Sequence, residues 1–193
     1  MDALPLKPFI DLLTQGIVNP RGATRRLLGV APSLQDRFVM VGLAGVMQGV
    51  FTSLAALIAP GFLGEGAAGG MGLSGLVALM LAVLVGYVVT ATLAYNIGTR
   101  FGGTGKPAEV ATAVALHALL VSALTPLQIA ALGTGSAPLL LLYLGFNVWL
   151  LASCVAEAHG FERIAPVVGV TLGVFLAVAM LLSLFVLALA PVT

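Results

Sequence analysis

His117 is the one ionisable side chain that lies well inside an apolar stretch of this sequence. An imidazole in such a place can relay protons, bind a metal ion or hydrogen-bond to a neighbour. Gln128 would lie on nearly the same face of a continuous helix, and Glu109 lies nearer its start. Two interpretations stay open: a proton path along this face, and a neutral histidine hydrogen-bonded to a neighbouring helix. A metal site has little support, because zinc takes three or four protein ligands and the chain has 2 histidines and 1 cysteine.

The apolar stretches also contain amide side chains, of which Asn96 and Asn147 complete a candidate intramembrane polar site with His117 and Gln128. Amides inside membrane spans hydrogen-bond between helices. Cys154 is expected to be a small packing residue. The sequence contains no Gly-x-Ser-x-Gly elbow, no His-Glu-x-x-His motif and no phosphate-binding Gly-Lys-Ser/Thr loop. We therefore expect no enzymatic activity, no cofactor and no metal.

Composition shows which solvent these residues must fold in. Hydrophobic residues make up 60% of the chain and charged residues 8%, whereas a soluble domain carries about 25% charged residues. A chain with this few charged residues could not cover a surface that faces water. Lipid must therefore surround most of it. The net charge of +1 gives no field that would attract nucleic acid.

Charged residues divide the chain into four long uncharged stretches, 38–64, 66–99, 110–156 and 164–193. A membrane-spanning helix needs about 20 residues, so the third stretch fits two helices and each of the others fits one. Lipid offers no partners to backbone groups, and the runs are continuously apolar, so helices are expected rather than a barrel. The fold class is therefore an all-α bundle of five membrane spans. Their predicted ranges are about 37–60, 72–98, 108–131, 138–156 and 165–190.

The basic residues predict the orientation of these spans. With five spans, the N-terminus and the loops 99–107 and 157–164 share one side, and this side receives all 8 lysines and arginines. Loops rich in lysine and arginine stay in the cytoplasm. We expect the N-terminus in the cytoplasm and the C-terminus outside.

Residues 1–36 form a predicted cytoplasmic amphipathic segment that precedes the membrane domain, 37–193. Apolar residues recur in it at helical spacing, and Asn19-Pro20 then interrupts the helix. The arginines that follow are candidates for contact with anionic headgroups or with a cytoplasmic partner. They are Arg21, Arg25 and Arg26. Ser33 and Asp36 have the spacing of a capping box that would begin the first span.

Small residues four apart predict close contacts between helices. The pairs are Gly45 with Gly49 in the first span and Gly169 with Gly173 in the last. Such pairs serve packing within one chain or a homodimer face. Pro126 should bend the third span, because proline lacks the backbone N–H that a helix interior needs.

Two stretches resemble the Ypt-interacting-protein (Yip) domain family. Residues 95–109, with the glycine-rich turn 102–106, resemble the turn between spans two and three of that family, and Pro126 fits the helix that follows. Residues 149–163 are similar to its fourth span and the loop after it, and Asn19-Pro20-Arg21 is similar to an element of bacterial members. The order and spacing of these stretches, over roughly 9–190, carry the resemblance.

The resemblance implies a bacterial-type member with five spans and a cytoplasmic N-terminus, in the inner membrane. The chain lacks the Asp-Leu-Tyr-Gly-Pro element of eukaryotic members and the aromatic residue that commonly precedes the proline of span three. Eukaryotic relatives bind Rab GTPases in vesicle traffic, and no residue of this chain supports transferring that role.

The leading functional hypothesis is a non-enzymatic membrane protein that binds or organises other membrane components, as a scaffold or an accessory subunit. Its expected partners are the lipid bilayer and other integral membrane proteins or further copies of the chain. The alternative is a small transporter or channel with His117 and Gln128 lining the path. A membrane-embedded enzyme ranks third, because the spans contain no Asp or Glu away from their ends.

Overall fold

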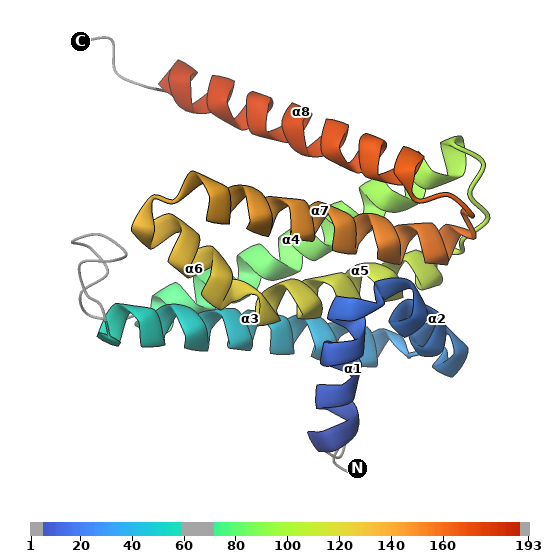
Figure 1. The fold of residues 1–193 in the computed structure, drawn as a ribbon, viewed down its shortest axis with the longest axis horizontal. Coiled ribbons are helices and arrows are strands. Elements are labelled where there is room, and N and C mark those ends of the chain that lie inside the picture. The colour runs from blue at the N-terminus through green and yellow to red at the C-terminus, as the bar shows by residue number, and fades with distance from the viewer. Residues whose placement is uncertain (1–5, 59–71, 190–193) are drawn as a thin grey trace.

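The computed structural model describes residues 6–58 and 72–189, and these form helices without any strand. The predicted external loop 61–71 and the last residues of the chain lie outside this part. Figure 1 shows the helices as a bundle with α8 on its outer side. Their bounds are α1 Leu6–Val18, α2 Pro20–Val30, α3 Leu34–Ile58, α4 Leu73–Arg100, α5 Pro107–Ala123, α6 Thr125–Thr134, α7 Ala137–His159 and α8 Ala165–Leu189.

Three of the described helices, α3, α4 and α7, are long and apolar enough to cross a membrane. A fourth candidate forms if α5 and α6, which meet at a bend of 51°, are one broken span. In α8 the apolar stretch that can be assessed is the shorter Ala165–Val178. The predicted all-α fold is confirmed and membrane spans are compatible with it, while the fifth span and the orientation stay predictions.

The N-terminal segment folds as two short helices that the predicted break separates. Asn19 caps α2 by accepting a hydrogen bond from the Gly22 N–H at 3.0 Å, and Pro20 occupies the first turn, where no N–H is needed. The capping box at the start of α3 is also confirmed. Ser33 N–H donates to the Asp36 carboxylate at 2.8 Å, and Asp36 N–H donates to the Ser33 hydroxyl at 3.2 Å.

The third predicted span is bent, as Pro126 predicts. Helix α5 ends at Ala123 and α6 begins at Thr125, with Pro126 in the first turn of α6. A proline there removes one backbone donor and clashes with the carbonyl of the preceding turn. Gln128 therefore lies on a different helix from His117, beyond the 51° bend.

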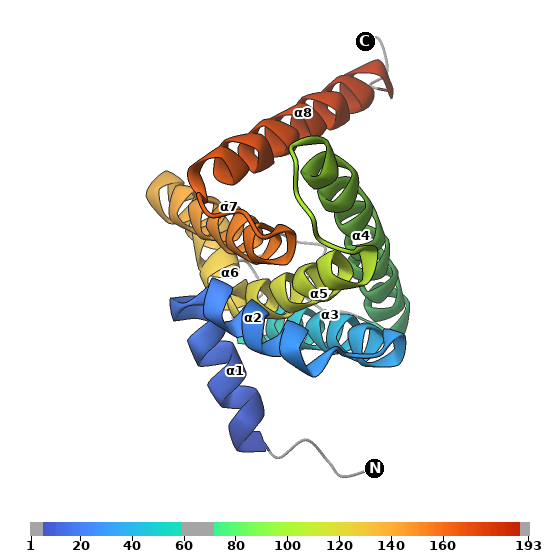
Figure 2. The ribbon, with the colours of Figure 1, turned by 90° about the vertical axis from the view of Figure 1, so that its right-hand side faces the viewer.

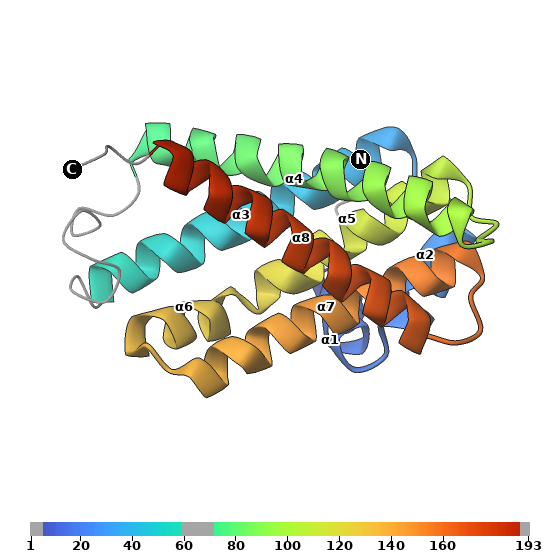
Figure 3. The same cartoon turned by 90° about the horizontal axis from the view of Figure 1, so that it is seen from above.

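Helix α5 lies at the centre of the bundle and packs against α3, α4 and α7. Val114, Leu116 and Leu120 of α5 and Leu150 of α7 are fully or almost fully buried in the core. Helix α8 packs against α7, and Figure 3 shows it crossing the outside of the bundle at an angle. Both α4 and α8 leave many large apolar side chains exposed, which suits helices that face lipid.

The ends of the helices that carry basic residues gather in one place. Figure 1 shows α2, the α4–α5 connection and the α7–α8 connection at the same end of the molecule. We call this the basic end. Arg100 ends α4 here, and the two connections contain Lys106 and Arg163.

Candidate functional site

An apolar groove of about 480 Å³ lies between α4 and α8. Figure 2 views the molecule from the basic end and shows α4, α5, α7 and α8 around this region. Most of the wall is aliphatic, and we call it the lateral groove. Its central lining residues are Val89, Leu93 and Ile97 of α4, Leu151 and Val155 of α7, and Val170, Val174 and Val178 of α8. The volume falls in the range of small-molecule binding pockets.

His117 is the one residue of α5 that lines the lateral groove. Its Nε2 lies 3.2 Å from Oδ1 of Asn147 on α7. In the tautomer with hydrogen on Nε2, the ring donates to the amide oxygen and joins the two helices. The interpretation of His117 as a histidine hydrogen-bonded to a neighbouring helix is therefore the one that the structure shows.

The other two members of the predicted polar site lie elsewhere. Asn96 is exposed on α4, and its amide donates to the Thr92 carbonyl of the same helix at 2.8 Å. Gln128 is half-buried on α6 and, like Asn96, does not line the lateral groove. The structure thus brings together His117 and Asn147 out of the four predicted residues.

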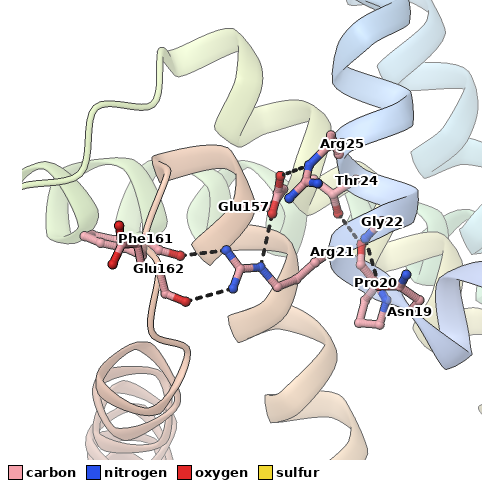
Figure 4. A network of polar contacts seen from close by, with 9 residues as sticks. All are labelled: Asn19, Pro20, Arg21, Gly22, Thr24, Arg25, Glu157, Phe161 and Glu162. Atoms are coloured by element: carbon pink, nitrogen blue, oxygen red, sulfur yellow. Dashed lines mark hydrogen bonds and ion pairs between the residues drawn. The ribbon is translucent and has the colours of Figure 1, made fainter.

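The basic end of the lateral groove is formed by the connection between α7 and α8. Arg21 of α2 holds this connection by donating to the backbone carbonyls of Phe161 at 2.6 Å and Glu162 at 3.1 Å (Figure 4). The Nε of Arg21 also donates to Oε2 of Glu157 at 3.1 Å. Phe161 and Glu162 both line the groove. The N-terminal segment therefore fixes the backbone at the groove entrance.

Arg25 completes this cluster, which we call the arginine clamp: Arg21, Arg25 and Glu157 (Figure 4). Its Nε donates to the second carboxylate oxygen of Glu157 at 2.6 Å. This bond and the opposite charge of Glu157 raise the pKa of Arg25 above its ordinary value. The Glu157 side chain is 10% exposed, so its charge is nearly buried and needs these partners.

The predicted membrane-contact arginines thus have partners within the chain. Arg21 and Arg25 bind Glu157, and Arg26 donates to the side chain of Gln15 on α1. The side chain of Arg25 remains 74% exposed, so it can meet a headgroup while it pairs with Glu157. Contact of these arginines with lipid or a partner stays a prediction.

His159, at the end of α7, sits in a second close-packed site at the basic end. The side chain is 2% exposed, and Nε2 lies 3.2 Å from the Ala94 carbonyl of α4. Glycines surround the ring: a Cβ added at Gly98 would lie 2.2 Å from Nε2, and one at Gly103 would lie 2.5 Å from Nδ1. We call this the histidine cradle, with Gly98, Gly103, Gly105 and His159 as its members.

The cradle joins the two stretches that carry the family resemblance. Thr104 N–H donates to the His159 carbonyl at 3.1 Å, which fixes the turn after α4 against the end of α7. A side chain at Gly105 would meet the Ala158 carbonyl oxygen at 2.4 Å, so backbone approaches backbone here. The predicted turn is confirmed at residues 101–102, where Gly102 has φ 86°, and residues 103–106 continue as an irregular connection to α5.

Sequence reasoning missed Glu157, His159 and the lateral groove. Glu157 and His159 appeared only as part of a loop, although a glycine-rich turn opposite a His-Gly pair is a detectable signal of close packing. No sequence pattern indicated the groove. Helix α8 is apolar on all sides, so the spacing of its apolar residues marks no face that would line a groove.

The predicted packing glycines divide between two environments. A Cβ added at Gly45 would meet Met80 at 3.5 Å, and one at Gly49 would meet Leu76 at 2.7 Å, both on α4. A Cβ added at Gly169 or Gly173 would have no neighbouring atom within 4 Å. The first pair therefore serves contact within the chain.

Chemically, the described part of the chain offers a binding surface rather than a cluster of reactive groups. Cys154 is fully buried. Within residues 6–58 and 72–189 no three His, Cys, Asp or Glu side chains lie together as a metal site requires. The lateral groove and the arginine clamp at its entrance are the features best suited to hold a ligand.

No family model, no curated protein and no solved structure matches this chain. The fold and the groove define a class: an all-helical protein with three or four described helices that can cross a membrane.

Proposed function

We propose that this chain is a non-enzymatic, multi-pass membrane protein that binds or organises other components of the membrane. We place it in the inner membrane of a bacterium, as a scaffold or an accessory subunit. The observation that carries the proposal is the lateral groove, whose aliphatic walls come from α4 and α8. In a bilayer, such a groove would admit a ligand from the membrane rather than from water.

The proposal includes five spans, namely α3, α4, α5 with α6, α7 and α8. Helix α8 has 25 residues, which gives a length of about 38 Å, more than the ~30 Å of a hydrocarbon core. With this count the basic end is cytoplasmic and the C-terminus lies outside, in agreement with the positive-inside rule. Helices α1 and α2 would then lie at the inner leaflet, where exposed Val18 and Val30 could enter the headgroup region.

We also propose that the chain is a bacterial-type member of the Yip domain family. The support is the order and spacing of the glycine-rich turn, the span-three proline and the His159-Gly160-Phe161 loop. The packing of the turn against His159 gives a physical reason for glycines at these positions.

Site-specific photo-crosslinking in native membranes tests the binding function. A photoreactive amino acid replaces Val174, which lines the lateral groove, or Leu172, which is 46% exposed on α8 and does not line it. We expect a defined adduct, with protein or lipid, at position 174 and much less at position 172. Equal capture at the two positions, or none at either, would contradict a ligand in the groove.

The second candidate function is a small transporter or channel, and the position of His117 on the groove wall favours it. Its path would have to run along the groove, because Gln128 and Asn96 lie elsewhere. Flux in proteoliposomes that disappears in His117→Ala would support transport. If the wild-type chain passes no solute or proton under any imposed gradient, this candidate fails.

A further inference from the structure

The entrance of the lateral groove carries one charge of each sign. Glu162 and Arg163 are adjacent in the α7–α8 connection, both are exposed, and both line the groove. Neither side chain forms an ion pair with another described side chain. A ligand whose polar end holds both a positive and a negative group would complement this pair.

The backbone that presents these two charges is fixed before any ligand arrives. Arg21 donates to the carbonyls of Phe161 and Glu162, and Glu157 in turn holds Arg21 (Figure 4). An ordered loop loses less conformational entropy on binding than a free one. The arginine clamp therefore prepares the entrance for a polar group.

The order of chemical groups along the groove indicates the kind of apolar ligand. Most of its lining is apolar, and Glu162 and Arg163 lie together at its basic end. A phospholipid has the same order of parts, with a charged headgroup at one end and an acyl chain that is apolar along its length. Such a chain is narrow and flexible, so it can lie between α4 and α8.

We propose that the lateral groove binds one acyl chain of a phospholipid whose headgroup carries a primary amine, of the phosphatidylethanolamine type. Arg163 binds the phosphate, and Glu162 accepts hydrogen bonds from the ammonium group. A phospholipid with an anionic headgroup and no amine would meet the Glu162 carboxylate with like charge. This assignment rests on the proposed function and names the ligand of the same groove.

The test uses the full chain in nanodiscs of phosphatidylcholine that contain a small fraction of photoactivatable lipid. The probe is phosphatidylethanolamine or phosphatidylglycerol with a diazirine on its acyl chain, and mass spectrometry locates the labelled peptides. We expect phosphatidylethanolamine to label α4 and α8 at the groove. Unlabelled phosphatidylethanolamine should compete with the probe, and phosphatidylglycerol should compete poorly.

Variants test separately where the acyl chain and where the headgroup of the lipid bind. Val174→Trp should fill the groove and lower labelling about ten-fold, whereas the matched Leu172→Trp on the other side of α8 should leave it unchanged. Glu162→Gln should reduce the preference for phosphatidylethanolamine over phosphatidylglycerol by about three-fold, the size of an exposed ion pair. Arg163→Gln should weaken labelling by both lipids. These two loop variants alter exposed side chains, so they test the proposal even if Val174→Trp fails to fold.

Three results would overturn the proposal: equal labelling by the two lipids in the wild type, full labelling of a folded Val174→Trp, or unchanged selectivity in Glu162→Gln. The proposed function is tested separately by the crosslinker at position 174 in native membranes. An adduct there with a protein, and none with lipid, would leave the binding function standing and refute the lipid assignment.

Discussion

Gly98→Ala should destabilise the protein by displacing His159. The new Cβ would lie 2.2 Å from Nε2, more than 1 Å inside the 3.4 Å at which ordinary contact begins. The ring has no room to retreat, because Gly103 and Gly105 enclose its other side. Overpacking of this kind costs about 1–3 kcal/mol, and losing the hydrogen bond to the Ala94 carbonyl adds about 1 kcal/mol. We therefore expect a loss of about 2–4 kcal/mol.

Cys154 provides the assay. It is the chain's one cysteine and is fully buried, so a fluorogenic thiol dye should react with it only when the detergent-solubilised protein unfolds. For a chain of this length, 1 kcal/mol corresponds to about 2–4 °C in Tm, so Gly98→Ala should lower Tm by at least about 4 °C. Gly86→Ala is the matched control on α4, because nothing lies within 4 Å of its added Cβ. We expect its Tm to stay the same or to rise, because alanine has the higher helix propensity.

A double-mutant cycle isolates the cause. If Gly98→Ala destabilises the protein by displacing the imidazole, it should lower Tm little in a chain where His159→Ala has already removed the ring. An unchanged Tm for Gly98→Ala, or an equal loss with and without the ring, would refute the role of the histidine cradle.

Three further predictions use the same dye assay or a topology measurement. Arg21→Gln should cost about 2 kcal/mol, because it removes charge-assisted bonds to Glu157 and the α7–α8 connection. Arg26→Gln on the same helix should cost under about 0.5 kcal/mol, and equal losses for the two would contradict the clamp. Asn147→Leu should lower the free energy of unfolding by about 1 kcal/mol, and His117→Leu should lower it less when Asn147→Leu is already present. If the two losses simply add in the double mutant, the hydrogen bond between these side chains does not stabilise the protein. Tags at the two chain ends should report opposite compartments, and a shared compartment would rule out five spans.

The lateral groove and the arginine clamp suggest how the N-terminal segment could matter to binding. Arg21 reaches from α2 to the groove entrance, so a contact at the basic end that moved α2 would also release the backbone of Phe161 and Glu162. The labelling experiment can be extended to this link. Arg21→Gln should weaken lipid labelling by freeing Phe161 and Glu162 at the entrance, while the groove walls from α4 and α8 stay in place.

Local features of the fold were predictable because their causes are local. The break at Asn19-Pro20, the capping box of Ser33 and Asp36 and the bend at Pro126 depend on a few neighbouring residues. The hydrogen-bonding chemistry and fixed φ of these residues act in any helix. The same holds for the all-helical fold, because the solvent implied by the composition leaves the backbone few other ways to satisfy its polar groups.

Contacts between distant residues required the tertiary structure. Glu157 and Arg21 are far apart in the sequence, and only the packing of α2 against α7 brings them to 3.1 Å. His117 could have faced lipid, another chain or a neighbouring helix, and the rotation of α5 in the bundle decides that it meets Asn147.

By itself, the sequence determined that the chain is helical and apolar enough for a membrane. It also located the break at Asn19-Pro20, the capping box at the start of α3 and the bend at Pro126. The tertiary structure decided that α4 and α8 stand apart to form a groove and that Arg21 and His159 fix its basic end. The physical reason is that helix α8 is apolar on every side. Periodicity can then mark no preferred face, and only the shapes of the packed neighbours select one.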